Sequence, residues 1–209
     1  MVTTREDRIV YGCAAVLLSY PGEQIAEDLE AVRFAAEGLG RRGAGPALAS
    51  LAQTLDRMGK REAERVYVST FDLGRRITLN LTFYSHGDTR SRGAALAALA
   101  EEYAMAGMEL SGGELPDFLP ALLELAASTK VEAEILARQE ASLRTLADAL
   151  AHDDSIYQEV VEVLIATLPR SGRRNRPELG LSEDGPPLEM VGLGNLPGYG
   201  VAHGGGGSS

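Results

Sequence analysis

The residues best suited to chemistry lie in a polar, aromatic and Gly-containing stretch from Tyr67 to Gly93, within a chain otherwise rich in Ala, Leu and Glu. His86 stands two positions before Asp88, and a histidine beside a carboxylate can serve as a general base. Catalysis also requires an oriented nucleophile or a substrate in reach, and the sequence contains no pattern for either. The stretch therefore favours a turn-forming or binding role for His86 over catalysis.

The sequence gives no support to metal or nucleotide chemistry. It has one cysteine among 209 residues and contains neither His-x-x-x-His nor Glu-x-x-His. No Gly-rich loop runs into Lys-Ser or Lys-Thr, as a phosphate-binding loop would. We therefore predict that the protein is not an enzyme and carries no metal or cofactor.

The single cysteine and the lack of apolar runs indicate a cytoplasmic protein. Cys13 cannot form an internal disulfide, which agrees with a reducing compartment, and its apolar neighbours predict a buried, inert thiol. No apolar run approaches the ~20 residues that span a bilayer. Residues 1–8 carry both charge signs and lack the apolar core of a secretion signal. We expect no stable membrane insertion.

The formal net charge of −10 restricts the partners of this chain. Nucleic-acid binding needs clustered Lys and Arg on the surface, so an acidic protein is not expected to bind it. An acidic surface favours a basic partner and speeds the encounter with it. The charge also keeps a protein soluble, and solubility alone is an equally good explanation.

Apolar residues at helical spacing predict an all-α fold, a single-domain bundle of about seven or eight helices over residues 1–168. Residues 169–209 are rich in Gly and Pro, and they predict a disordered tail. Thr4 is placed to cap the first helix. The expected helices are Arg5–Ser19, Glu23–Gly38, Ala47–Met58, Lys60–Phe71, Gly93–Met105, Phe118–Ala127, Lys130–Leu150 and Asp154–Leu168.

One segment has a different pattern, because Ile77, Leu79, Leu81 and Phe83 alternate with polar residues. Such alternation is typical of a half-buried strand. A single strand needs a partner, and no other segment offers one. We therefore expect this segment to be helical.

Several side chains in this region could bind a peptide. Tyr67 and Phe71 stand four residues apart and share a helix face, although core packing would also explain the pair. Carboxylates near these rings would form an acidic rim for an amphipathic, basic peptide. Asp88 or Thr89 could instead cap a helix starting near Arg90, and Asp117 could cap the next. The candidate binding residues are Tyr67, Phe71, Asp72, Arg75, His86, Asp88, Arg90, Glu114, Asp117 and Phe118.

Three sequence blocks resemble a known family. They are Phe71-Asp72 with Gly74-Arg75, the run from His86 to Gly93, and Leu-Pro-Asp-Phe-Leu-Pro at residues 115–120. In order and spacing they are similar to the assembly chaperones of respiratory nitrate reductase (NarJ type), a group of redox-enzyme maturation chaperones. Weaker likeness runs from about residue 7 to residue 168. Phe118 stands where relatives often carry His, so no role of that imidazole is carried over.

The resemblance implies an all-helical protein that binds the immature, molybdenum-containing catalytic subunit of nitrate reductase. In that family the chaperone binds the N-terminal segment of the apo subunit in the cytoplasm and supports insertion of the molybdopterin guanine dinucleotide cofactor. The loop at 114–120 and the segment 67–93 would shape the client site. Two alternatives stay open: a chaperone of a dimethylsulfoxide or trimethylamine-oxide reductase, and a small helical enzyme using His86 with Asp88 or Asp117.

Overall fold

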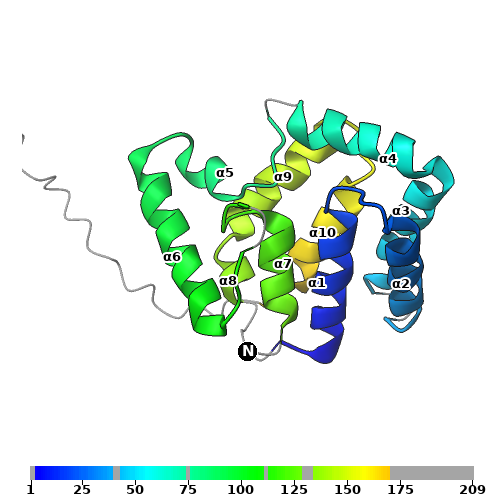
Figure 1. Ribbon diagram of the computed structural model, residues 1–209, viewed down its shortest axis with the longest axis horizontal. Coiled ribbons are helices and arrows are strands. Elements are labelled where there is room, and N and C mark those ends of the chain that lie inside the picture. Colours follow the sequence, from blue (N-terminus) through cyan, green and yellow to red (C-terminus); the bar gives the residue numbers. More distant parts are fainter. Residues whose placement is uncertain (1–2, 40–42, 74–75, 111–112, 129–133, 170–209) are drawn as a thin grey trace, which may run out of the picture. The chain divides into compact units, whose positions relative to one another are not determined.

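The computed structural model describes residues 3–39, 43–73, 76–110, 113–128 and 134–169. These residues form ten α-helices and one π-helical turn, with one isolated backbone bridge and no strand, so the all-α prediction is confirmed (Figure 1). The helices are α1 Arg5–Leu17, α2 Ile25–Glu37, α3 Gly45–Met58, α4 Lys60–Tyr67, α5 Thr82–His86, α6 Arg90–Ala106, α7 Leu119–Ala127, α8 Glu134–Ala137, α9 Glu140–His152 and α10 Gln158–Thr167; the π-helical turn η1 is Val68–Asp72.

Three parts of the prediction fall outside the described residues. They are the tail from residue 170 on, Arg75, and the first four residues of the helix expected over Lys130–Leu150. The division at residue 168 therefore stays a prediction. No helix in the described part is long and apolar enough to cross a bilayer.

Helix α1 begins where the sequence predicts. The Thr4 hydroxyl accepts from the backbone N–H of Asp7 at 3.1 Å, and the Asp7 carboxylate accepts from the backbone N–H of Thr4 at 2.8 Å. This reciprocal capping box satisfies two of the N–H groups that a helix start leaves without partners. The Thr4 cap is thereby confirmed.

The core is built around α1 and α7, which pack against each other (Figure 1). In the sequence of α7, Leu119 to Ala127, only Glu124 is exposed, as expected for a helix enclosed by neighbours. Helix α1 contributes small residues at the contact, and a side chain at Gly12 would meet Ala127 at 4.0 Å. Helices α2 and α3 pack together at one end of the bundle, and α6 lies at the other.

Cys13 is buried in this core, as predicted, and burial raises the pKa of its thiol to about 11. At pH 8 such a thiol is roughly one part in a thousand thiolate, against roughly one quarter for a free thiol of pKa about 8.5. We expect the native protein to react with a disulfide reagent at least about 100-fold more slowly than the urea-unfolded chain. A native thiol that reacts at the unfolded rate would contradict this burial.

The helices of the C-terminal part differ from the prediction in two places. The single helix expected over Lys130–Leu150 is broken, because Gln139 N–H bonds to Leu136 O at 2.9 Å in a tight turn between α8 and α9. Apolar positions such as Leu136 and Leu143 keep helical spacing across this turn, so periodicity hides it. The last helix starts at Gln158 rather than Asp154, which has a φ of 48° and ends α9 in a left-handed turn.

The expected helix over residues 77–83 is wrong for most of its length. The backbone of Asn80 forms an antiparallel bridge with Phe118, Leu81 N–H donates to Asp117 O at 3.0 Å, and Leu119 N–H donates to Leu79 O at 2.8 Å. Ile77, Leu79 and Leu81 are buried, as the alternation indicates. The missing partner is the Leu-Pro-Asp-Phe-Leu-Pro block, which lacks the apolar alternation of a strand.

Candidate functional site

The site is centred on the end of α4, where the helix widens into η1. Leu73 N–H bonds to Val68 O at 3.0 Å, five residues back, and the hydroxyls of Ser69 and Thr70 bond to Val66 O. Such single π-turns are frequent at functional sites. The turn leaves Phe71 buried while Asp72 and Leu73 face outward.

An aromatic cluster fixes this turn from inside. The ring of Phe71 lies 5.0 Å from that of Tyr67 and 4.9 Å from that of Tyr157, and Tyr20 packs edge-on against Tyr67 at 5.5 Å. Tyr67 and Phe71 do share a face, as predicted. They are only 5% and 7% exposed, so they belong to the core and do not form an open aromatic floor.

A pocket of about 290 Å³ opens beside the π-turn. Phe71 and Asp72 form one wall, and the paired segment from Ile77 to Phe83 forms another. Arg92 from α6 completes the lining. The pocket therefore brings the first and second sequence blocks together.

Phe83 separates this pocket from a second, more apolar one. Its side chain is 39% exposed, and it also lines a cavity of about 480 Å³ against α9, together with Tyr84 and Ala149. Arg76, Asp148 and Asp153 stand around that cavity. Phe83 therefore contributes to the lining of both pockets.

The Asp117 carboxylate is buried and hydrogen-bonded inside the protein. It is fully buried and accepts from Asn80 Nδ2 at 2.9 Å, from Thr82 N–H at 3.2 Å and from the Thr82 hydroxyl at 2.5 Å. Arg92 completes the group, with Nη2 at 3.5 Å from the carboxylate and Nε donating to Thr82 Oγ1 at 3.1 Å. A buried carboxylate requires such partners. We call Asn80, Thr82, Arg92 and Asp117 the polar cluster.

The polar cluster overturns two expectations for Asp117. It does not cap α7, which begins after Phe118 without a side-chain cap, and it does not lie on an exposed rim. Phe118 is half-buried beside the bridge. The second and third sequence blocks are thus joined through Arg92 and Asp117.

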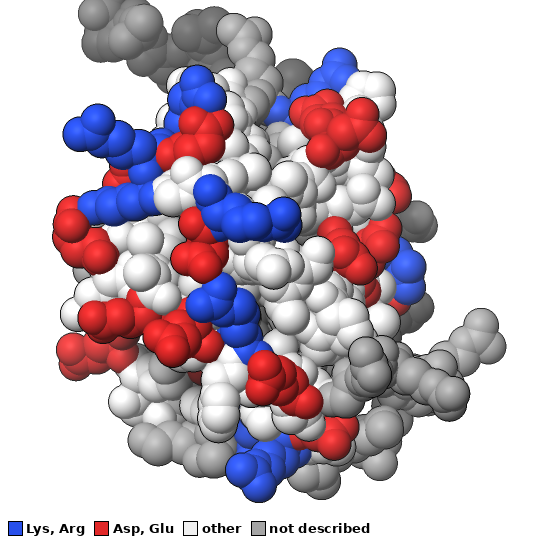
Figure 2. All heavy atoms as spheres, turned by 90° about the vertical axis from the view of Figure 1, so that its right-hand side faces the viewer, with Lys and Arg blue, Asp and Glu red and all other residues white. Residues whose placement is uncertain are grey.

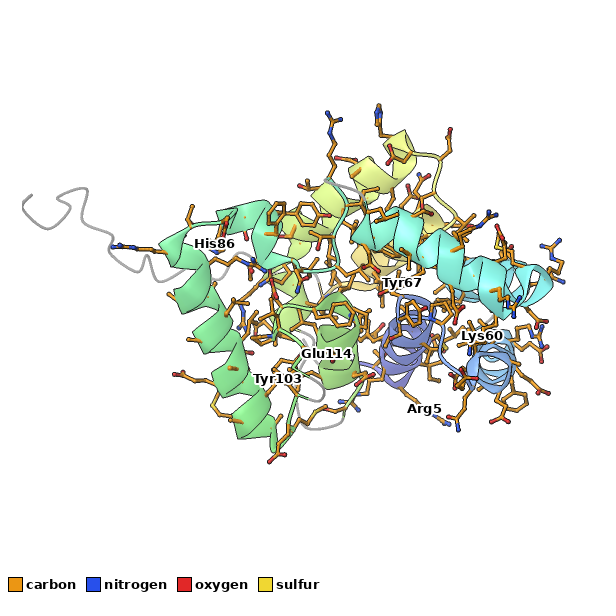
Figure 3. All side chains as sticks on the ribbon, turned by 45° about the horizontal axis from the view of Figure 1, so that its top comes forward. Arg5, Lys60, Tyr67, His86, Tyr103 and Glu114 are labelled. Carbon is orange, nitrogen blue, oxygen red and sulfur yellow. The ribbon has the colours of Figure 1, made fainter. Side chains whose placement is uncertain are left out.

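Two of the predicted carboxylates, Asp72 and Glu114, act on the same buried phenol. Burial raises the pKa of Tyr67 far above its usual range, and the charges of Asp72 and Glu114 add to the shift. Both carboxylates are exposed, and both lie close enough to act on one phenol. Glu114 also contributes to the raised pKa of Tyr103, after burial and Glu124. In Figure 3, Tyr67, Glu114 and Tyr103 are labelled in the middle of the view, between His86 and Lys60.

The remaining predicted residues lie elsewhere. His86 is at the turn between α5 and α6, apart from Tyr67 and Glu114 (Figure 3). The Ser91 hydroxyl lies 3.3 Å from His86 Nδ1, and Thr89 donates to His86 O at 2.7 Å. Helix α6 starts at Arg90, as the capping interpretation predicts and three residues before the expected bound at Gly93, but Thr89 makes no side-chain cap. Asp88 and Arg90 are exposed there.

The geometry does not favour acid–base catalysis. The His86 ring lies next to the Ser91 hydroxyl, and the Asp117 carboxylate accepts hydrogen bonds within the polar cluster. Among the described residues, no group of three or more His, Cys, Asp or Glu side chains could hold a metal ion.

Several site residues have weak sequence signals. Arg92 lies inside the second block, but only its contact with Asp117 reveals its role. Asn80, Thr82 and Phe83 lie in the misassigned segment. No sequence pattern around Tyr20 indicates that it contributes to the site.

The fold matches a redox-enzyme maturation protein. A crystal structure described as a proposed redox enzyme maturation protein from Archaeoglobus fulgidus aligns with a TM-score of 0.59 and 22% identity, covering 77% of this chain and 93% of that one. At this identity the likeness shows a shared helical fold.

The sequence comparisons define the family. Residues 40–159 match the family model described as nitrate reductase delta subunit. The chain is 31% identical over 179 residues to the NarJ nitrate reductase molybdenum cofactor assembly chaperone of Bacillus subtilis, covering 85% of this chain and 97% of the relative. It is 38% identical over 78 residues to the NarJ chaperone of Escherichia coli K12, covering 37% of this chain and 33% of that relative.

This chain belongs to the nitrate reductase delta subunit family. The resemblance drawn from three sequence blocks is confirmed. The relatives named here are maturation chaperones rather than enzymes.

Proposed function

We propose that this protein is a private chaperone that binds the immature catalytic subunit of a respiratory nitrate reductase and supports insertion of its molybdenum cofactor. The observation that carries the proposal is the match to the Bacillus subtilis chaperone over 97% of that protein's length. The all-helical fold and the binding pockets agree with it. The protein acts in the cytoplasm, before the enzyme is attached to the membrane.

The N-terminal segment of the client binds at the π-turn. Apolar side chains of that segment contact Phe83 and the neighbouring pockets, while its Lys and Arg side chains face Asp72 and Glu114. This is the amphipathic-helix-in-groove mode of peptide recognition. Release requires that the chaperone bind the flexible apo subunit more tightly than the finished one, because a ligand shifts an equilibrium only through differential affinity.

Charge reversal at the π-turn tests this arrangement. Asp72→Lys with Glu114→Lys is expected to weaken client binding by about 10-fold at ~0.02 M salt, since exposed ion pairs contribute about 0.2–1 kcal/mol each and reversal adds repulsion. The loss is expected to shrink at ~0.5 M salt. The measurement is calorimetric titration with a peptide covering the first ~20 residues of the catalytic subunit.

The control variant is Glu27→Lys with Glu109→Lys, which changes the net charge equally at exposed positions outside the pocket. Equal affinities for the two double variants would remove Asp72 and Glu114 from the site. Co-purification with the nitrate reductase operon tests the function itself. Retention of a dimethylsulfoxide reductase type subunit in place of the nitrate reductase subunit would assign another client.

A further inference from the structure

A second groove lies at the junction of α1 and α2, with walls from α3 and α7. Its volume is about 220 Å³, and it is separated from the π-turn by the contact between Tyr20 and Tyr67. Most of its lining is apolar. The lining residues are Val16, Leu17, Ser19, Tyr20, Pro21, Gly22, Ile25, Asp28, Leu29, Leu55 and Glu124.

Two large side chains stay exposed at this groove. Val16 is 39% exposed and Tyr20 is 53% exposed, although both adjoin buried residues of the core such as Leu17 and Leu29. A tyrosine that presents an apolar ring and a polar hydroxyl at a surface is well suited to a polypeptide contact. The groove is smaller than the ~300–1,000 Å³ typical of small-molecule sites. It fits one or two side chains of a partner.

The charges of the groove favour a cationic partner. Asp28 and Glu124 are its charged lining residues, and they form no ion pair with any described residue. The nearby Lys60 is already paired with Glu23 and Glu64. The acidic character of the groove is therefore left uncompensated within the described part of the chain.

Glu124 is the exposed residue of α7, and its carboxylate is only partly desolvated. Burial raises its pKa, and the charge of Glu114 raises it further. Because the side chain is exposed, solvent screens most of this effect, and its contribution to stability is small. A cation bound beside Glu124 would favour the ionised carboxylate.

The neighbouring face of the molecule carries charges of both signs. The face formed around α2, α3 and α4 shows Lys and Arg interspersed with Asp and Glu (Figure 2). On these helices Arg33 pairs with Asp56 at 2.6 Å, and Arg65 pairs with Glu62 at 2.6 Å. These pairs leave little net charge to attract a partner.

We infer that the groove between α1 and α2 docks a second, short segment of the client, in which an apolar anchor side chain is flanked by Lys or Arg. The identity of the partner rests on the proposed function, whereas the acidic and apolar chemistry of the groove does not. A second copy of this chain is a poorer occupant, because its formal net charge of −10 would bring like charges to the acidic groove. Two docking points would raise the affinity through effective concentration.

Photo-crosslinking locates the partner on the groove. The photoreactive residue p-benzoylphenylalanine replaces Tyr20 in one variant and the exposed Phe34 of α2, which does not line the groove, in a matched control. Each variant is co-expressed with the full-length catalytic subunit and irradiated. We expect the Tyr20 position to crosslink to a client segment containing Lys or Arg, at least about 10-fold more strongly than the Phe34 position.

Charge reversal supplies the second measurement. Asp28→Lys with Glu124→Lys is expected to weaken retention of the catalytic subunit by at least about 10-fold. The control is Glu27→Lys with Glu101→Lys: Glu27 shares the first turn of α2 with Asp28, so the helix dipole affects both substitutions equally. Thermal unfolding by circular dichroism verifies that both variants are folded.

The outcomes separate this inference from the proposed function. If the wild-type chain does not retain the catalytic subunit, the proposed function fails. If it does, while Tyr20 crosslinks no more than Phe34 and the groove variant binds like its control, the groove inference alone is overturned. Crosslinks from Tyr20 to a second copy of this chain would also overturn it.

Discussion

Asp117→Ala is expected to lower the free energy of unfolding by about 3–5 kcal/mol, the usual cost of removing one partner from a buried ion pair. The substitution leaves the Arg92 guanidinium, the Asn80 amide and the Thr82 backbone N–H without their acceptor; Thr82 is buried, and the other two residues are partly buried at the pocket wall. Urea denaturation followed by circular dichroism measures the loss. Client binding should fall as well, because the polar cluster holds the pocket wall in place.

Two further variants test whether the loss of stability in Asp117→Ala comes from the polar cluster. Asp88→Ala removes an exposed carboxylate, and it should change stability by no more than about 0.5 kcal/mol. Arg92→Met combined with Asp117→Ala should cost less than the sum of the two single losses, since the residues interact directly. An Asp117→Ala protein that loses under about 1 kcal/mol would refute a structural role for this carboxylate.

Tyr157→Ala is expected to cost about 3–5 kcal/mol, the range for removing a large aromatic ring from a core. The ring is fully buried and lies 4.9 Å from that of Phe71 and 6.5 Å from that of Tyr67. The Tyr157 ring therefore packs against the buried side of the π-turn. Urea denaturation measures the loss, and the client titration shows whether the pocket beside Phe71 is lost with it.

Tyr157→Phe is the matched control. The hydroxyl is buried and has no hydrogen-bond partner among the described residues. Its removal should leave stability unchanged or raise it by about 1 kcal/mol, because a buried polar group without a partner is unfavourable. A large loss in Tyr157→Phe would instead indicate that the hydroxyl, and not the ring, stabilises the cluster.

Structural features that depend on residues close together in the chain are predicted well from the sequence. The capping box at Thr4 and the helical spacing of Leu48, Leu51 and Leu55 place α1 and α3 within about two residues of their observed bounds. The burial of Cys13 follows from its apolar neighbours in the same way. These features need no information from distant parts of the chain.

The features that the sequence hides depend on contacts across long separations. Asp117 at the start of a helix resembles a cap, and only Asn80, 37 residues away, and Arg92, 25 residues away, show that it is buried. The four-residue spacing of Tyr67 and Phe71 predicts that both side chains lie on one face of the helix. It does not predict whether that face is exposed to solvent. Exposure depends on Tyr157, which lies far along the chain.

The bridge between Asn80 and Phe118 joins two segments that the ribosome synthesises at different times. Residues 77–83 reach the ribosome exit well before their partner segment does. A growing chain lacking the stretch around Leu119 also lacks the backbone bonds that Leu79 and Leu81 make to that stretch. We expect this wall of the pocket to be complete only once α7 has emerged.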